Sequence, residues 1–151
     1  NLGAQAAVDT LNAVLEHGKD IPTTPQKEDK NLQPAPKIFK ETCKINWNQS
    51  DEKIYNFVRG LSPYPGVWTL LYNKEQAEDG KEEVLKIFKT SRTDESSKEA
   101  VGTIVVDKGR ILVATTNNYL SIEELQLAGK RRMNAKDFLN GFKNLEQYML
   151  K

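Results

Sequence analysis

A proline-rich stretch between residues 19 and 36 divides this 151-residue chain into two unequal parts. It holds four of the chain's six prolines, namely Pro22, Pro25, Pro34 and Pro36. Each proline fixes φ and removes a backbone donor, so neither a helix nor a central strand can run through the stretch. The polar run 26–31 also offers no core side chains. We therefore expect an extended, stiff linker over residues 19–36.

The short segment before the linker, residues 1–18, has the pattern of an amphipathic helix. Apolar side chains recur at steps of three and four, which places them on one helix face: Ala4, Ala7, Val8, Leu11, Val14 and Leu15. Gly18 can turn the chain after the helix at positive φ. Such a face needs a covering surface, so we expect this helix to belong to a preceding domain.

Residues 37–151 contain one early helix followed by several short strands. Ser50 is placed to cap a helix from Asp51 to about Gly60, and the sequence Pro-Tyr-Pro-Gly then forces a turn. Five apolar, β-prone segments follow, at 67–72, 83–90, 102–106, 111–115 and 119–127, the last with an irregularity at 123–124. The sequence Asp-Lys-Gly-Arg at 107–110 is a strong hairpin signal. These segments predict a mainly β fold with flanking helices: a small antiparallel, OB-like barrel.

The C-terminal residues predict a final helix. Asn134 is placed as its N-cap, and its apolar side chains would be Phe138, Leu139, Phe142, Leu145 and Leu150. On this reading the segment 119–127 is the last strand.

Composition excludes several kinds of function. No apolar run approaches the roughly 18 residues that cross a bilayer, and no signal-peptide pattern opens the chain. One cysteine, Cys43, and one histidine cannot make a typical zinc site or an internal disulfide. Neither a glycine-rich phosphate loop nor a nucleophile elbow is present. The chain thus has no self-contained active site, and we expect a cytoplasmic protein without a membrane partner.

Charge is unevenly distributed although the net charge is only +1. Residues 70–99 carry six basic and eight acidic side chains, whereas residues 125–151 carry six basic and two acidic ones. Such asymmetry matters for a polyanionic partner, because it gives the fold one positive side.

Several motifs, in one order, resemble a known family. The segment 44–47 reads Lys-Ile-Asn-Trp, and 58–68 reads Val-Arg-Gly-Leu-Ser-Pro-Tyr-Pro-Gly-Val-Trp. Gly-Thr-Ile follows at 102–104, Leu-Ser-Ile at 120–122, and Leu-Gln-Leu-Ala-Gly-Lys-Arg-Arg-Met at 125–133. Together they resemble the C-terminal domain of the methionyl-tRNA formyltransferase family. Asn46 departs from this pattern, since the family commonly has Asp before the Trp.

This resemblance implies a function for the parent protein. The family transfers a formyl group from 10-formyltetrahydrofolate to the α-amino group of methionine on initiator tRNA, in translation initiation. Its N-terminal Rossmann-like domain holds the folate site and a catalytic Asn, His and Asp, none of which has a match here. Residues 1–18 then correspond to the last helix of that missing domain, 19–36 to the linker, and 37–151 to the tRNA-binding barrel. We expect this fragment to be inactive alone, and the parent enzyme to be a monomer.

A basic cluster at 130–136 is the main candidate for contact with tRNA. It comprises Lys130, Arg131, Arg132 and Lys136. Arginine can grip two phosphate oxygens at once, and several cations together supply phosphate affinity. The alternative is a solvated turn. Lys40 and Lys44, at the end of the linker, are further candidates beside the alternative of a merely soluble linker.

Two other functions would fit part of the pattern: the barrel of a nucleotide-sugar formyltransferase, and a free-standing nucleic-acid-binding OB module. The basic cluster argues against the first, since a small sugar nucleotide does not need it. The N-terminal helix and linker argue against the second. The aromatic residues Trp47, Tyr64 and Trp68 stand among proline and aliphatic residues, and we expect them to pack in the core rather than to stack on bases.

Overall fold

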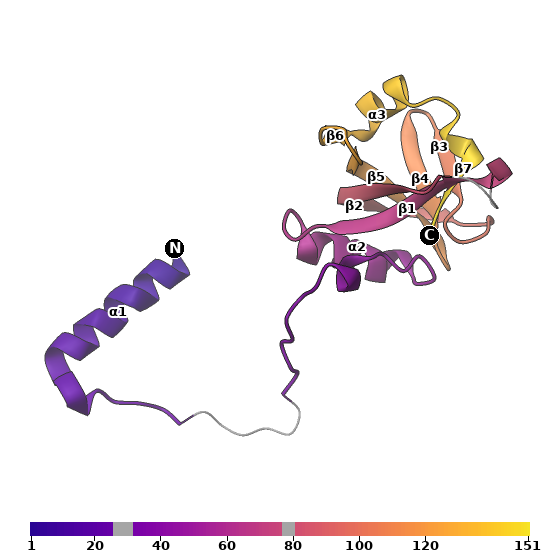
Figure 1. Ribbon diagram of the computed structural model, residues 1–151. Helices are drawn as coiled ribbons and strands as arrows, with labels where there is room; N and C mark the ends of the chain where they lie inside the picture. The colour runs from indigo at the N-terminus through magenta and orange to yellow at the C-terminus, as the bar shows by residue number, and fades with distance from the viewer. Residues whose placement is uncertain (26–31, 77–80) are drawn as a thin grey trace. The chain divides into compact units, whose positions relative to one another are not determined.

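Seven strands of the chain form one antiparallel sheet that closes almost completely into a barrel in the computed structural model (Figure 1). The structure describes residues 1–25, 32–76 and 81–151, which divide into two units, Asn1–Pro36 and Lys37–Lys151. The strands are β1 Val67–Asn73, β2 Glu83–Ser96, β3 Ile104–Asp107, β4 Arg110–Ala114, β5 Asn118–Leu127, β6 Met133–Asn134 and β7 Tyr148–Leu150. The predicted fold class, a small antiparallel barrel with flanking helices, is confirmed.

The first unit contains helix α1, Leu2–His17, followed by a 3₁₀ turn at Gly18–Asp20. Gly18 follows the helix with φ of 55°, as its position in the sequence predicts. None of the α1 side chains is buried, and the apolar face that includes Leu2, Leu11 and Leu15 is exposed. The predicted linker run 26–31 lies outside the described residues.

The strand order is β3-β4-β5-β2-β1-β7, with β6 added to β5. A bridge between Thr103 and Met149 brings β7 back toward the start of β3 and so closes the barrel. Alternate side chains point inward, as the two-residue period of a strand requires. The inward set includes Val67 and Leu71 of β1, Leu85 and Ile87 of β2, and Leu120, Ile122 and Leu125 of β5.

Helix α2, Asp51–Leu61, packs on β2 and β5 through Ile54 and Val58. Ser50 caps it by accepting a hydrogen bond from the Lys53 N–H at 3.4 Å, as predicted. The hairpin at 107–110 is also confirmed, since Lys108 and Gly109 have φ of 49° and 80°. Two positive φ values in succession define the turn that matches strand twist.

The C-terminal prediction is wrong in two respects. β5 is not the last strand, because β6 and β7 follow it. The final helix, α3, spans only Ala135–Gly141, so Leu145 lies in a 3₁₀ turn and Leu150 in β7. There are two reasons. Asn144 adopts a left-handed conformation, which a helix cannot continue through. Residues 148–150 form hydrogen bonds with β1 and so become a strand.

Strand β2 is longer than predicted, because it continues through the polar residues 91–96. Its pairing with β1 covers only residues 83–87, whereas its pairing with β5 continues to Ser96. The register shifts between Ile87 and Thr90, opposite residues 122–125 of β5, which confirms the predicted irregularity there. In the described part of the chain, no helix has the length and apolarity to cross a membrane.

Candidate nucleic-acid interface

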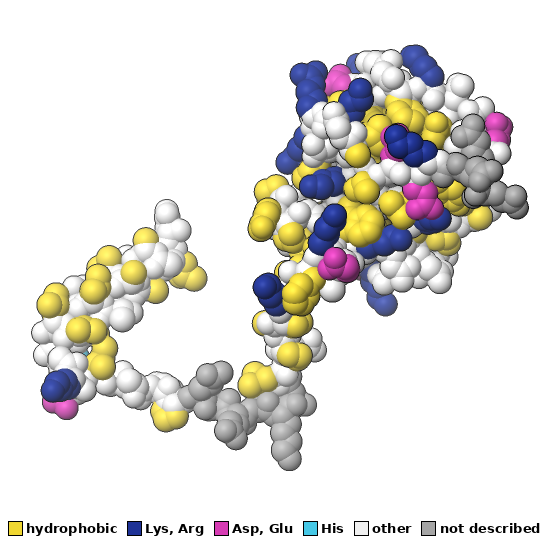
Figure 2. Space-filling view, viewed as in Figure 1, with side chains coloured by type: hydrophobic (Ala, Val, Ile, Leu, Met, Phe, Trp, Pro, Cys, Tyr) yellow, Lys and Arg dark blue, Asp and Glu magenta, His cyan; other side chains and the backbone are white. Residues whose placement is uncertain are grey.

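The outward face of β1, β2 and β5 carries a transverse row of Trp68, Lys86 and Gln126, which lie opposite one another in the strand register. Neighbouring strands lie about 4.8 Å apart, so this row spans roughly 10 Å. None of its three side chains is buried, although Leu85 and Ile87 on either side of Lys86 are. Figure 2 shows Lys and Arg side chains gathered over the face where β1 and β2 lie in front, with hydrophobic side chains between them.

Trp68 holds the start of the barrel unit at one end of this row. Its indole Nε1–H donates to the Lys40 carbonyl oxygen at 2.8 Å, and its own carbonyl accepts from the Ile45 N–H at 2.8 Å. The Lys44 ammonium lies 5.7 Å from the Trp68 ring centroid, within cation–π range. Lys44 bridges Trp68 on the side of β1 opposite β2, so Trp68 lies between Lys44 and Lys86, and the Lys40 backbone is held at the same indole.

Replacing Trp68 by Phe tests this attachment. The phenyl ring retains the packing but loses the donor to Lys40, so the free energy of unfolding should fall by about 1 kcal/mol. Amide hydrogen exchange at residues 41–45 should accelerate. The matched variant Trp47→Phe loses a different indole bond, from Nε1 to Thr69 Oγ1 at 2.9 Å, and should leave exchange at 41–45 unchanged. Equal exchange in Trp68→Phe and wild type would contradict this role.

The other end of the row leads into the turn that carries the basic cluster. The Gln126 side chain donates to the Lys130 carbonyl oxygen at 2.8 Å, and the Lys130 N–H donates to the Leu127 carbonyl at 2.9 Å. Gly129 takes φ of 74°, which lets the turn close. These bonds place Lys130 beside the outward sheet face.

Arg132 differs from its neighbours because its charge is already partnered. Its Nε donates to Glu124 Oε2 at 2.8 Å, and its guanidinium lies 4.3 Å from the Phe88 ring centroid. Because the guanidinium of Arg132 stacks on Phe88 and pairs with Glu124, it is already engaged by the protein itself. Within the part of the chain that the structure describes, no ion pair involves Lys130, Arg131, Lys136, Lys40 or Lys44. All five are exposed.

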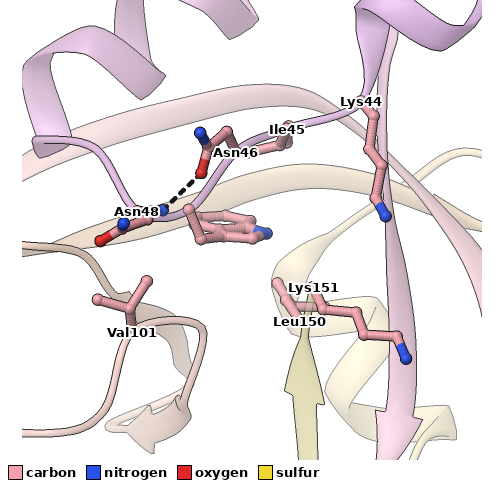
Figure 3. A pocket seen from close by; sticks show the side chains of 8 residues that line it. Lys44, Ile45, Asn46, Asn48, Val101, Leu150 and Lys151 are labelled. Atoms are coloured by element: carbon pink, nitrogen blue, oxygen red, sulfur yellow. Dashed lines mark hydrogen bonds between the residues drawn. The ribbon is translucent and has the colours of Figure 1, made fainter.

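A shallow cavity of about 430 Å³ lies next to Lys44 on the barrel (Figure 3). Figure 3 shows Lys44 and Lys151 on the same side of it, and Asn46 on the opposite side. Asn46 Oδ1 accepts from the Asn48 N–H at 3.0 Å, so this residue shapes the loop rather than joining an ion pair. The Lys151 ammonium pairs with Glu82, and this hydrogen bond raises the pKa of Lys151 above its ordinary value. Lys151 therefore stays charged, with its charge offset by Glu82.

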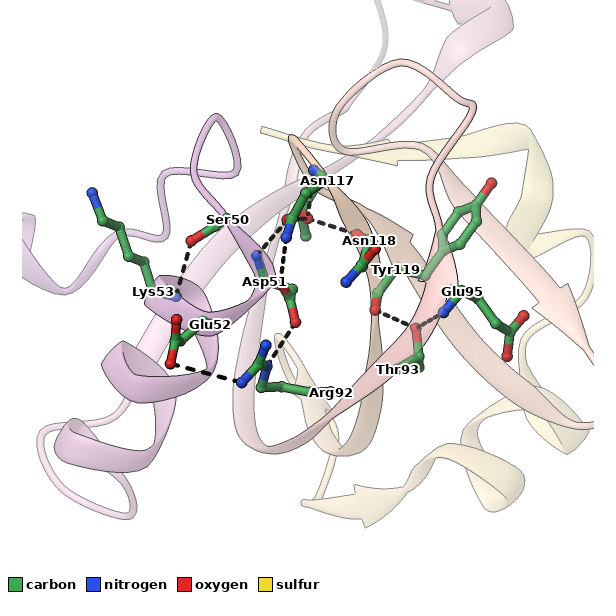
Figure 4. A network of polar contacts seen from close by, with 11 residues as sticks. Ser50, Asp51, Glu52, Lys53, Arg92, Thr93, Glu95, Asn117, Asn118 and Tyr119 are labelled. Atoms are coloured by element: carbon green, nitrogen blue, oxygen red, sulfur yellow. Dashed lines mark hydrogen bonds and ion pairs between the residues drawn. The ribbon is translucent and has the colours of Figure 1, made fainter.

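A buried carboxylate ties α2 to the sheet away from this face (Figure 4). Asp51 is fully buried and lies between Arg92 of β2 and Asn117, as Figure 4 shows. Its oxygens accept from Arg92 Nε and Asn117 Nδ2, each at 2.7 Å. Burial alone would raise the pKa of Asp51, but these two hydrogen bonds and the positive charge of Arg92 outweigh it and lower that pKa. The role of this network is therefore structural, because it attaches α2 to the sheet.

From the sequence alone, Lys86 was missed and two of the three aromatic residues were misplaced. Lys86 was not singled out, although its position between two buried strand residues signals an outward charge. The expectation of core packing is confirmed for Trp47, which is buried, but it is wrong for Tyr64, which is 89% exposed. Trp68 is half-buried, and instead of packing in the core it holds the start of the barrel unit at Lys40 and Ile45. Tyr64 lies in a turn between two prolines, where no neighbouring element covers it.

Comparison with known proteins agrees with this architecture. Residues 37–143 match the family described as formyl transferase, C-terminal domain, and the chain belongs to that family. It is 45% identical over 152 residues to a methionyl-tRNA formyltransferase of Parabacteroides distasonis, a match covering 97% of this chain and 45% of that protein. It is 40% identical over 153 residues to the methionyl-tRNA formyltransferase of Bacteroides fragilis, covering 100% of this chain and 46% of that protein. The family resemblance read from the motifs is thus confirmed.

The chain spans less than half the length of these curated relatives. Among solved structures, a variant of HypX from Aquifex aeolicus shares the fold, with a TM-score of 0.62 over 91% of this chain and 23% of that one. At 20% sequence identity this likeness concerns the fold alone.

Proposed function

We propose that this chain is the tRNA-binding part of a methionyl-tRNA formyltransferase, acting in the cytoplasm as part of a monomeric enzyme. The relatives carry that name, and the observation that bears most directly on RNA is the outward face of β1, β2 and β5. Lys40 and Lys44 lie at the β1 end of it, Lys86 lies in the middle, and Lys130 with Arg131 lies at the β5 end. Cations spread over one face are what binding to a phosphate backbone requires.

On this proposal, the residues that catalyse formyl transfer lie outside this chain. The formyl donor, 10-formyltetrahydrofolate, would bind in the catalytic domain, and the formyl acceptor is the methionine on initiator tRNA. Within the described residues, the single histidine His17 lies on α1 with its Nε2 at 3.7 Å from Glu16, not in an Asn–His–Asp arrangement. We assign α1 to the catalytic domain, whose surface would cover its exposed apolar face, and residues 19–36 to the linker between the domains.

The structure alters the expected contribution of the basic cluster. From the sequence, Lys130, Arg131 and Arg132 would each neutralise a phosphate, whereas Glu124 already partners Arg132. Each lost phosphate contact reduces the magnitude of the log–log salt slope by roughly 0.7 to 0.9. The double change Lys130→Ala with Arg131→Ala should therefore flatten the slope of tRNA binding by about 1.5. Arg132→Ala should change it by much less.

The measurement is a salt titration of tRNA binding to the 151-residue chain. Lys98→Ala, an exposed lysine in the loop after β2, serves as a surface control and should leave the slope unchanged. In the intact enzyme, the double change should raise KM for methionyl-tRNA more than it lowers kcat, since the contacts are remote from the reacting atoms. If the salt curves of wild type and the double variant superimpose, Lys130 and Arg131 do not contact phosphates, and the cluster is only a solvated turn.

A further inference from the structure

Within the described residues, three cations of the basic cluster have no ion-pair partner, and two of them, Lys130 and Arg131, line one cavity. This cavity, of about 290 Å³, lies between the β5–β6 turn and α3, and we refer to it as the α3 cavity. Its lining residues are Leu127, Lys130, Arg131, Met133, Asp137, Phe138, Gly141 and Phe142. It is therefore an apolar hollow with a charged rim, beside the face that we propose binds RNA.

The wall of the α3 cavity is aromatic and held in place. Phe138 and Phe142 stack with ring centroids 5.1 Å apart and planes 15° apart. Phe142 also packs edge-on against Tyr148 of β7, again at 5.1 Å, so its ring is fixed from a second side. Met133 adds a flexible thioether, which makes favourable contacts with aromatic rings. Flat, apolar walls of this kind suit a flat ring.

The rim offers opposite charges at defined places. Lys130 and Arg131 supply positive charge from the turn, and Asp137 supplies a carboxylate from α3. Asp137 is held by Asn134, whose Nδ2 donates to Asp137 Oδ2 at 3.0 Å, while Asn134 Oδ1 caps the helix by accepting from the Asp137 N–H at 2.8 Å. A ligand matching this rim carries an anion at one end and a hydrogen-bond donor on an aromatic ring at the other.

A nucleotide has this combination of features, and we propose that the α3 cavity receives one unpaired nucleotide of the bound RNA. Its base would enter the apolar hollow against Phe142, and its phosphate would lie at Lys130 and Arg131. The Asp137 carboxylate favours a base with an exocyclic amino group, since an amino group can donate to it. Unstacked bases held on aromatic side chains are the usual means of reading single-stranded RNA. This inference rests on the proposed function and adds the part of the RNA that is recognised.

Gly141 provides a way to fill the cavity without disturbing the core. It lines the cavity, its φ is not in the left-handed region, and a Cβ built on it meets no atom within 4 Å. Gly141→Leu should therefore place a side chain in the hollow and leave the fold intact. Gly60 on α2 is the matched control: it also has open space around its Cβ, and none of the cavities described here is lined by it.

The first experiment titrates the isotope-labelled 151-residue chain with 5′-AMP and, separately, with inorganic phosphate, and follows backbone amide shifts. 5′-AMP should shift the amides of Met133, Asp137 and Phe142, and phosphate should shift these much less. The AMP-induced shifts should vanish in Gly141→Leu and persist in Gly60→Leu. Equal shifts with phosphate and AMP would indicate an anion site only and overturn the proposal, as would unchanged AMP binding by Gly141→Leu.

The second experiment measures tRNA binding to the same variants at one salt concentration. Since stacking of one base on an aromatic side chain typically changes affinity by fivefold or more, Gly141→Leu should weaken tRNA binding at least roughly fivefold, and Gly60→Leu should not. Wild-type affinity in Gly141→Leu would overturn the nucleotide pocket while leaving the proposed function in place. Failure of the wild-type chain to bind tRNA would instead count against the proposed function, and the AMP titration would still decide the cavity.

Discussion

Replacing Gly102 by alanine is expected to lower the free energy of unfolding of the barrel by about 2–5 kcal/mol. Gly102 has φ of 85°, a conformation that costs a residue with a side chain about 1–2 kcal/mol. An alanine Cβ there would also overlap the backbone carbonyl of Leu150, which cannot rotate away as a side chain would. The carbonyl of Gly102 accepts from the Leu150 N–H at 2.9 Å, so moving β7 aside would sacrifice this hydrogen bond, at about 1–3 kcal/mol.

Gly109→Ala is the matched control for this variant. Gly109 has a similar φ of 80°, but nothing lies within 4 Å of a Cβ built on it. It should therefore show only the conformational cost, about 1–2 kcal/mol. Urea unfolding followed by tryptophan fluorescence reports on the barrel alone, because both tryptophans lie in residues 37–151. Equal losses in the two variants would show that the approach of Leu150 is not the cause.

Removing the charge of Asp51 is expected to produce the second large effect. Asp51→Asn keeps the shape of the side chain but turns one acceptor into a donor, which then faces Arg92 or Asn117. Losing a buried, charge-assisted hydrogen bond should lower the free energy of unfolding by about 2–4 kcal/mol at pH 7. Glu52→Gln is the control, because Glu52 is exposed and lies 3.7 Å from Arg92; it should cost less than about 1 kcal/mol.

The effect of Asp51→Asn should depend on pH in one direction. Because the pKa of Asp51 is lower in the folded chain than its ordinary value of about 3.9, its stabilising contribution is complete above that value. As the pH falls toward the folded-state pKa, protonation removes this contribution. The difference in unfolding free energy between wild type and Asp51→Asn should therefore be largest at neutral pH and shrink below about pH 4. A difference that stays constant from pH 7 to pH 3 would contradict the charged role of Asp51.

Local signals predicted the elements whose causes are local. The Ser50 cap, the positive φ values of the 107–110 hairpin and Gly18 after α1 each follow from one or two residues. The C-terminal strand could not be predicted in this way. Residues 148–150 are too short to show an alternating pattern, and they become a strand only because β1 offers unpaired backbone groups. Helical spacing of Phe138, Phe142 and Leu145 suggested one long helix, whereas Asn144 interrupts it.

The candidate site was predictable in its charges but not in their partners. The run at 130–132 marked the basic cluster correctly as exposed, yet no sequence pattern shows that Glu124 partners Arg132 eight positions later. Likewise, Lys86 joins the row only through the register that sets it between Trp68 and Gln126. Pairing across strands depends on the whole barrel, so the sequence reveals which charges exist and the structure reveals which remain available.

The closure of the barrel by β7 also bears on how the domain folds. The Thr69 hydroxyl donates to the Lys151 carbonyl at 3.0 Å, and these two residues are 82 positions apart. Contacts of such long range delay folding, because the loop between the partners loses entropy before the contact repays it; sheet proteins dominated by them fold in milliseconds to seconds. The pairing of β7 with β1 also joins the first and last strands of the barrel into one cooperative unit. A substitution that disrupts the three-residue strand β7 should therefore unfold the entire barrel rather than fray β7 locally.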